Sequence, residues 1–129
     1  MTGSEPTGML ALQTIAMPAD TNSGGDIFGG WLMSQMDLGS AVLARARARG
    51  RVATVAAQEI IFLRPVLVGD VVSIHAAIVR LATTSMTIEI EAWVRRQAMD
   101  ERTKVATARF VFVAVDEAGR KRPLPEAVA

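Results

Sequence analysis

One carboxylate, Asp37, lies inside a segment that is otherwise apolar, rich in glycine and rich in methionine. The residues before it are WLMSQM, and Ser40 and Ala41 follow three and four positions later, on the same face of a helix. Small residues on that face leave room for a ligand beside the acid. A carboxylate in this setting suits a general base acting on water, or a nucleophile that attacks a carbonyl. The alternative from these residues alone is a solvated acid on an oligomer surface.

Two Gly-Gly pairs precede Asp37 and supply a second kind of candidate group. Gly29 and Gly30 open the predicted helix, where backbone N–H groups have no partner within the helix and the helix dipole is positive. Such N–H groups can bind a carbonyl oxygen as it becomes an oxyanion. The alternative is close packing of the helix start against a strand. Asn22 lies just upstream, where its amide can orient a water or a substrate carbonyl, or can close an Asx-turn.

The residue types that are missing exclude several chemistries. The chain has no cysteine and no tyrosine, and His75 is its one histidine. A Ser-His-Asp triad would have to use His75, which lies in the apolar segment VSIHAAIV and is better explained as a packed strand residue. Zinc and non-haem iron normally need several His or Cys ligands. We therefore expect no metal site, which leaves Asp37 as the best chemical group in the chain.

The basic side chains are spread over several segments. Arginines at alternate positions from 45 to 51 are expected at a solvated helix end, where the negative end of the helix dipole favours them. Arg64 and Arg120 are candidates for holding phosphate groups, although each is also an ordinary surface charge. Trp31 and Trp93 are expected to be core or interface anchors rather than ligand-stacking groups.

Composition indicates one globular domain over residues 1–129, with flexible tails at 1–8 and 125–129. Half of the residues are hydrophobic, 21% are charged and the net charge is +1, so no strong field for nucleic acid or an anionic membrane is expected. No segment is apolar enough for a membrane helix, and the first residues lack the pattern of a secretory signal. Together with the absence of cysteine, this pattern favours a cytoplasmic protein.

The hydrophobic pattern predicts one strand, one long helix and then four or five strands. The helix is expected over 28–49 with Gly50 as its C-cap, and its apolar residues spread around most of its circumference. Short connections imply antiparallel neighbours, and a helix that covers one face of such a sheet is an α+β arrangement. The strands are expected over 9–18, over 52–57 and 59–66 as one long bent strand, and over 71–81, 84–96 and 105–116.

The spacing between the two candidate groups has a geometric consequence. Gly30 and Asp37 are seven positions apart, so on one helix they are separated by roughly 10 Å. One reacting carbon cannot touch both. If both groups act on the same bond, they come from two chains with facing helices. Surplus apolar surface and open sheet edges also favour a symmetric oligomer.

The segment MPADTNSGGDIFGGWLMSQMDLGSAVLA resembles the hotdog-fold acyl-CoA thioesterases, specifically their YciA-type bacterial branch. The resemblance continues through ATVAAQEIIFLRPVLVGDVV, TTSMTIEIEAWVRR and FVFVAVDEAGRKRPLP, and so covers about residues 9 to 124. It implies a long central helix wrapped by a five- to six-stranded antiparallel sheet. It also implies hydrolysis of acyl-CoA to free acid and CoA without a metal or redox cofactor, in dimers that commonly assemble as hexamers.

The resemblance also assigns roles to individual residues. The aspartate of the family's SQMD segment falls on Asp37, and the asparagine of its DTN segment falls on Asn22. Gly30, or its neighbour Gly29, falls where a backbone N–H polarises the thioester carbonyl. The family's channel for CoA is lined by a segment that falls on Thr84 and Ser85.

This chain departs from the family pattern at two places. It has Gln58 where similar sequences often carry an acid, and Ala82-Thr83 where they carry Gly-Arg or Gly-Asn. The second change concerns the grip on the nucleotide. The prediction from the sequence is therefore an acyl-CoA thioesterase that binds acyl-CoA and CoA. Its rivals are a hydrolase of acyl-carrier-protein thioesters and a non-enzymatic acyl-CoA-binding module.

Overall fold

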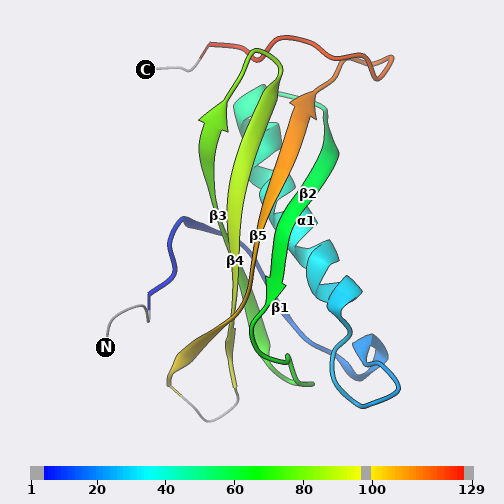
Figure 1. The fold of residues 1–129 in the computed structure, drawn as a ribbon, viewed down its shortest axis with the longest axis vertical. Coiled ribbons are helices and arrows are strands. Elements are labelled where there is room, and N and C mark those ends of the chain that lie inside the picture. The colour runs from blue at the N-terminus through cyan, green and yellow to red at the C-terminus, as the bar shows by residue number, and fades with distance from the viewer. Residues whose placement is uncertain (1–4, 97–99, 127–129) are drawn as a thin grey trace.

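The protein forms one helix packed against one five-stranded antiparallel sheet, as predicted (Figure 1). The computed structural model describes residues 5–96 and 100–126 of the chain. The strand order is β1-β3-β4-β5-β2, so β1 and β2 are the two edges of the sheet. The elements are β1 (Met9–Ile15), a 3-10 turn (Pro18–Asp20), α1 (Gly29–Ala48), β2 (Val52–Phe62), β3 (Val71–Leu81), β4 (Ser85–Arg95) and β5 (Arg102–Ala114).

The helix α1 agrees with the prediction to within one residue at each end, but its C-cap is wrong by one position. Arg49, not Gly50, takes the left-handed conformation with φ 53°. Gly50 instead follows at φ 152°, and its N–H donates to the carbonyl of Arg45 at 3.2 Å. The last turn is therefore closed by two successive N–H groups that bind the same carbonyl.

Close packing at one glycine sets the distance between α1 and the sheet. A Cβ atom on Gly39 would lie 2.7 Å from Cγ2 of Ile74 on β3. Met36 and Ser40, on the same side of the helix, are completely buried, and the Ser40 hydroxyl donates to the Met36 carbonyl. One face of α1 is thus fixed against β3, and the opposite face remains open, with Leu38 55% exposed and Val42 51% exposed.

The middle strands alternate between a buried face and a wetter face. On β4 the even positions from Met86 to Val94 point toward the helix and are buried, as the period of two predicted. Thr87, Glu89 and Glu91 lie on the other face, which we call the outer face. Trp93 is the exception on that face because it is 2% exposed, in agreement with its expected role as an anchor.

The predicted long bent strand exists as β2, but it ends at Phe62 rather than at residue 66. Its pairing with β5 shifts register between Thr54 and Ala56 and again between Gln58 and Ile61. Glu59 lies within the second irregularity and has a left-handed φ of 52°. At the end of β2, the Phe62 ring reaches the first residue of α1, 3.1 Å from the position of a Cβ on Gly29.

Other strand ends also differ from the prediction. The first strand stops at Ile15 because Pro18 opens the 3-10 turn, and the last strand is shifted to begin at Arg102 and end at Ala114. The connection between β3 and β4 comprises residues 82–84 and is closed by a hydrogen bond from Ala82 N–H to the Ser85 carbonyl. Of the tails expected to be flexible, residues 1–4 and 127–129 lie outside the described residues.

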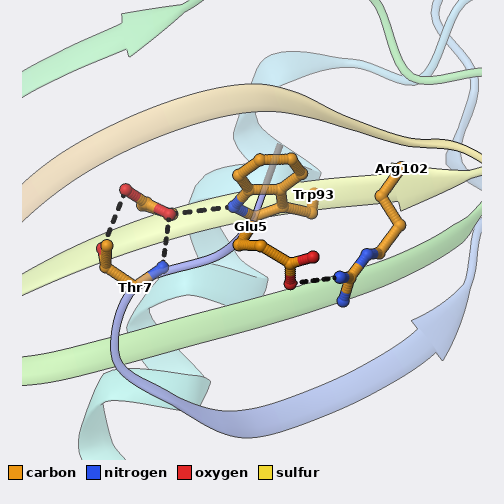
Figure 2. A network of polar contacts seen from close by, with 5 residues as sticks. Glu5, Thr7, Trp93 and Arg102 are labelled. Atoms are coloured by element: carbon orange, nitrogen blue, oxygen red, sulfur yellow. Dashed lines mark hydrogen bonds and ion pairs between the residues drawn. The ribbon is translucent and has the colours of Figure 1, made fainter. Parts of the chain in front are cut away.

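The N-terminal segment crosses the outer face of the sheet (Figure 2). Thr7 donates to the carboxylate of Glu91 from its backbone N–H at 3.0 Å and from its hydroxyl at 2.9 Å. The Trp93 indole donates to the same carboxylate, and Arg102 pairs with Glu5. Partial burial raises the pKa of Glu91, but the hydrogen bonds from Thr7 and Trp93 outweigh it and leave that pKa below its ordinary value.

Candidate active site

Asp37 is held by a side chain from the sheet. Its Oδ1 accepts a hydrogen bond of 2.7 Å from the hydroxyl of Thr54 on β2. The acid is partly buried at the boundary between the face of α1 that packs on the sheet and the open face that carries Leu38. A carboxylate oriented in this way keeps a second oxygen for other partners, which is what a base or nucleophile requires.

The start of α1 presents unpaired backbone donors. Gly29 and Gly30 are its first two residues, and Phe28 caps the helix without a side-chain hydrogen bond. Within the described residues, the N–H groups of the two glycines donate to no acceptor. The positive end of the helix dipole lies at the same place, so the two groups form a small site for a carbonyl oxygen or an oxyanion.

The two alternatives considered for Gly29 and Gly30 both have support. A Cβ on Gly29 would lie 3.1 Å from the Phe62 ring, and one on Gly30 would lie 3.3 Å from the Phe28 ring. Close packing therefore explains the absence of a side chain at Gly29. It does not remove the free N–H groups, because the aromatic rings lie on the side-chain face of the backbone.

Asn22 closes an Asx-turn with its side-chain oxygen. That oxygen accepts from the N–H of Gly24 at 2.8 Å and from the N–H of Asp26 at 3.3 Å. The Asx-turn and a role in binding are compatible, because the turn uses the oxygen only. The amide nitrogen keeps two donors, which can bind an acceptor on a ligand.

Asn22, Gly29 and Arg64 line one pocket of about 390 Å³. It lies between the start of α1 and the end of β2, at the lower end of the molecule in Figure 1. Its walls are mostly apolar side chains, with polar groups at a few points. The remaining lining residues are Asp26, Ile27, Leu32, Phe62, Leu63, Pro65 and Val66.

The other predicted substrate-binding residues lie at the opposite end of the protein. Ser85 pairs with Val113, and the Thr84 carbonyl accepts from the N–H of Ala114. Arg120 lies in the turn that follows β5, where its N–H donates to the Asp116 carboxylate at 2.9 Å. In the same segment the N–H of Val115 donates to the carbonyl of Arg51, just after the C-terminal end of α1. The helix of 20 residues between these two ends is roughly 30 Å long. One protomer therefore does not bring Thr84, Ser85 and Arg120 together with Asn22, Gly29 and Arg64.

Three of the four arginines near the end of α1, Arg45, Arg49 and Arg51, are exposed, as predicted, and Arg47 is partly buried. Arg47 donates to the carbonyl of Pro125 at 2.6 Å, and Arg51 donates to the carbonyl of Glu117 at 2.9 Å. These two side chains fix the segment after β5 against the helix end.

A charged cluster on the outer face stands apart from the pocket. Arg109 on β5 pairs with Glu89 and, at 3.2 Å, with Glu59. The hydrogen bond to Glu89 and the attraction of Glu59 raise the pKa of Arg109 above its ordinary value. His75 is packed in β3 beside Glu91, and its Nδ1 is buried without a hydrogen bond among the described residues. None of these groups lines the pocket that contains Asn22.

Two kinds of site are not found in the described part of the chain. Residues 5–96 and 100–126 contain no group of three or more His, Cys, Asp or Glu side chains arranged to hold a metal ion. Within the same ranges, no helix is both long enough and apolar enough to cross a membrane.

Two contributors were missed in the sequence. Thr54, which binds Asp37, lies in a strand segment where a threonine is ordinary, and Phe62, which lines the pocket, has the appearance of any strand aromatic. Because both contacts join α1 to β2, only the packing of the two elements reveals them.

Comparison with known proteins identifies relatives over nearly the whole chain. The profile of the thioesterase superfamily matches residues 24–99. The acyl-CoA thioester hydrolase YciA of Salmonella typhimurium is 56% identical over 123 residues, which cover 93% of this chain and 92% of that protein.

Solved structures of hexameric thioesterases are similar to this chain in both sequence and fold. A hexameric thioesterase from Yersinia pestis has a TM-score of 0.91 at 50% identity, covering 95% of this chain and 100% of that one. A hexameric, broad-specificity acyl-coenzyme A thioesterase, solved as a variant with one aspartate changed to alanine, has a TM-score of 0.90 at 48% identity. The match covers 93% of this chain and 88% of that structure.

Proposed function

This chain belongs to the thioesterase superfamily and is a thioester hydrolase, and we propose that it cleaves acyl-CoA with Asp37 as the reacting carboxylate at a dimer interface. The products are the free carboxylic acid and CoA. Similarity to an acyl-CoA thioester hydrolase over 93% of the chain supports the substrate class. The position of Asp37 supports the mechanism.

The hydrogen bond between Thr54 and Asp37 is the observation that carries the proposal. A solvated surface acid would not need a partner from the sheet, but a reacting carboxylate must be held in one orientation. The 2.7 Å contact fixes one carboxylate oxygen and leaves the other free. Partial burial keeps the acid accessible to a water or a substrate while excluding bulk solvent from one side.

A second copy of the chain completes the site. Asp37 and Gly30 lie on the same helix roughly 10 Å apart, so the carbonyl bound at Gly30 is attacked by the acid of the facing helix. An antiparallel pair of helices that matches Gly30 with Asp37 also brings Leu38 against the start of the facing helix. The exposed side chains of Leu38 and Phe28, 55% and 42% exposed, then cover each other. The hexameric state of two structural relatives agrees with self-association.

The chemistry follows from these positions. Asp37 removes a proton from a water that attacks the thioester carbon, or attacks that carbon itself and is released by water. The carbonyl oxygen becomes an oxyanion and accepts from the N–H of Gly30 in the facing chain. The side-chain amide of Asn22 orients the water or the carbonyl. The carbon–sulfur bond then breaks, and CoA leaves as a thiolate, which needs no strong general acid.

The same pairing accounts for the two groups of predicted binding residues. In this register Leu38 lies opposite the start of the facing α1, so the ten residues from Gly39 to Ala48 extend roughly 15 Å past that start. Thr84, Ser85 and Arg120, at that end of one chain, then lie beyond the pocket of the other chain that contains Asn22, Gly29 and Arg64. CoA extends from the reacting carbon toward Thr84, Ser85 and Arg120, and Arg120 binds its phosphates. Arg64 lies at the exposed edge of the pocket beside Gly29, so the phosphate role expected for it from the sequence stays a prediction. The cytoplasmic location expected from the sequence stays a prediction.

A panel of acyl-CoAs with a free-thiol readout tests the proposal. We expect thiol release by the wild-type protein and its loss in Asp37→Ala and Asp37→Asn. Equal activity of Asp37→Ala and wild type would contradict the assigned mechanism. Comparing the hydrolysis rates of one acyl group carried by CoA and by acyl carrier protein shows which carrier the enzyme prefers. A wild-type protein that binds CoA but releases no thiol would be a binding module.

A further inference from the structure

The pocket beside Gly29 has a chemical character of its own. Ile27 and Val66 are buried in its wall, 7% and 3% exposed, and Leu32 is 3% exposed. Its polar side chains, Asn22, Asp26 and Arg64, are exposed. A volume of about 390 Å³ falls within the range of roughly 300–1,000 Å³ that is usual for small-molecule sites. An apolar interior with a few polar groups suits an alkyl chain whose head group remains outside.

The bond geometry of the substrate decides which part enters this pocket. The reacting carbon carries three groups, namely the oxygen, the sulfur of CoA and the acyl chain. When the oxygen binds at the N–H groups of Gly29 and Gly30, the other two groups must leave in different directions. The pantetheine arm has two amides and leads to charged phosphates, which an apolar pocket would leave without partners. The acyl chain has no polar groups, so its burial in the pocket leaves no hydrogen-bonding group without a partner.

Phe62 is the side chain placed to limit the depth of this pocket. Its ring carbons lie 3.1 and 3.5 Å from the position of a Cβ on Gly29, so the ring rests directly on the first residue of α1. Phe62 is nevertheless 49% exposed. The ring is therefore a wall of the pocket rather than a part of the core, and its replacement changes the pocket more than the fold.

Resting on the proposed function, we propose that the pocket between the start of α1 and the end of β2 binds the acyl chain, and that Phe62 sets the longest chain it accepts. Each methylene buried in the pocket improves binding roughly fourfold, the change that about 0.8 kcal/mol represents. The gain stops when the chain reaches the Phe62 ring. Beyond that length, further methylenes remain in water or must displace the ring.

A series of straight-chain acyl-CoAs from acetyl to palmitoyl, read as kcat/KM by thiol release, tests this assignment. In the wild type, kcat/KM should rise with chain length and then level or fall. Phe62→Ala should move this optimum to longer chains, with a gain of roughly tenfold or more for chains just beyond the wild-type limit. Phe62→Trp should move it to shorter chains. Opposite shifts from the two variants are not a result that misfolding produces.

Ile61→Ala is the matched control, because Ile61 is the neighbour of Phe62 on β2, is 52% exposed and pairs with Thr107 on the other face. Its chain-length profile should equal that of the wild type. Dissociation constants of the same acyl-CoAs for Asp37→Asn, with and without Phe62→Ala, read the pocket without turnover. If thiol release depends on Asp37 but Phe62→Ala changes neither the profile nor these constants, the acyl assignment is wrong while the proposed function stands. If no acyl-CoA is hydrolysed by the wild type, the proposed function fails, and unchanged dissociation constants would then also remove the acyl pocket.

Discussion

The hydroxyl of Thr54 donates a hydrogen bond of 2.7 Å to the carboxylate of Asp37, and it joins the centre of the helix to the edge strand β2. Asp37 reaches the open side of the helix, and without this contact its side chain would sample several rotamers. A positioned carboxylate is the difference between an ordinary helix acid and a reacting group.

Thr54→Val keeps the shape of the side chain and removes the hydroxyl. Hydrogen bonds to charged groups contribute about 1.5–3 kcal/mol, so we expect kcat to fall roughly tenfold or more while KM changes little. Thr54→Ser restores the donor and should restore most of the activity. Steady-state kinetics on one acyl-CoA measure all three proteins. A Thr54→Val enzyme with wild-type kcat would show that Asp37 needs no support from β2.

The N–H of Gly30 can be removed without breaking the helix. Proline is tolerated in the first turn of a helix because the N–H there has no partner within the helix. Gly30→Pro should lower kcat by roughly a hundredfold or more, the usual loss of one oxyanion donor. Gly30→Ala keeps the N–H and places its Cβ 3.3 Å from the movable Phe28 ring, so it serves as the control. Circular dichroism of both proteins checks that α1 is intact, and equal losses in the two would assign the effect to packing.

The central helix and the order of elements along the chain were predictable, because their hydrophobic periods are strong and the elements are longer than the usual error at an element end. The predictions from the sequence were wrong at the ends of elements, namely at the C-cap of α1 and at the end of β2. The cap is at Arg49 rather than at Gly50, because Arg49 itself takes the left-handed conformation and the helix ends one residue earlier than the glycine suggests. The bends of β2 were anticipated, but its end at Phe62 depends on contact with α1.

Asp37 became the candidate reacting group by elimination, since no cysteine and one packed histidine leave few other chemical groups. The link between Asp37 and Thr54 was not found, because residues 17 positions apart on two different elements share no sequence period. The separation of the predicted binding residues into two ends also required the fold. It depends on α1 running the length of the sheet, which places its two termini beside different loops (Figure 1).

Gly39 provides a test of how closely α1 approaches the sheet. Alanine is the better helix former by about 0.8–1.0 kcal/mol, so propensity alone predicts that Gly39→Ala is stabilising. The new Cβ would lie 2.7 Å from Ile74 Cγ2, and overpacking of this kind costs about 1–3 kcal/mol. We expect a net loss of stability in urea denaturation at one fixed protein concentration. The double variant Gly39→Ala with Ile74→Val should recover part of the loss, whereas a stabilised Gly39→Ala would show that the helix moves away freely.

The contact between Glu91 and the N-terminal segment should make the stability of the protein depend on pH. Its pKa in the folded protein lies below the ordinary value of 4.5, so its charged form is favoured by folding. The resulting stability is fully present above the unfolded pKa and is lost as the pH falls through the lowered folded pKa. The difference in unfolding free energy between wild type and Glu91→Gln should therefore be largest near neutral pH and shrink below about pH 4.5. Glu101→Gln, on an exposed residue, is the control. A pH-independent difference for Glu91→Gln would contradict the linkage.

Glu59 holds a left-handed conformation, with φ 52°, inside the second bend of β2. A residue with a Cβ loses about 1–2 kcal/mol there, and glycine does not. Glu59→Gly and Glu59→Ala both remove the ion pair with Arg109, which is exposed and so contributes little. The difference in unfolding free energy between the two variants therefore reports only the cost of the left-handed backbone conformation. We expect the glycine variant to be more stable by about 1 kcal/mol, opposite to the order in an ordinary strand. Chemical denaturation of the two proteins at equal concentration measures it. If alanine proved equal or better, β2 would have relaxed to an ordinary extended conformation at this position.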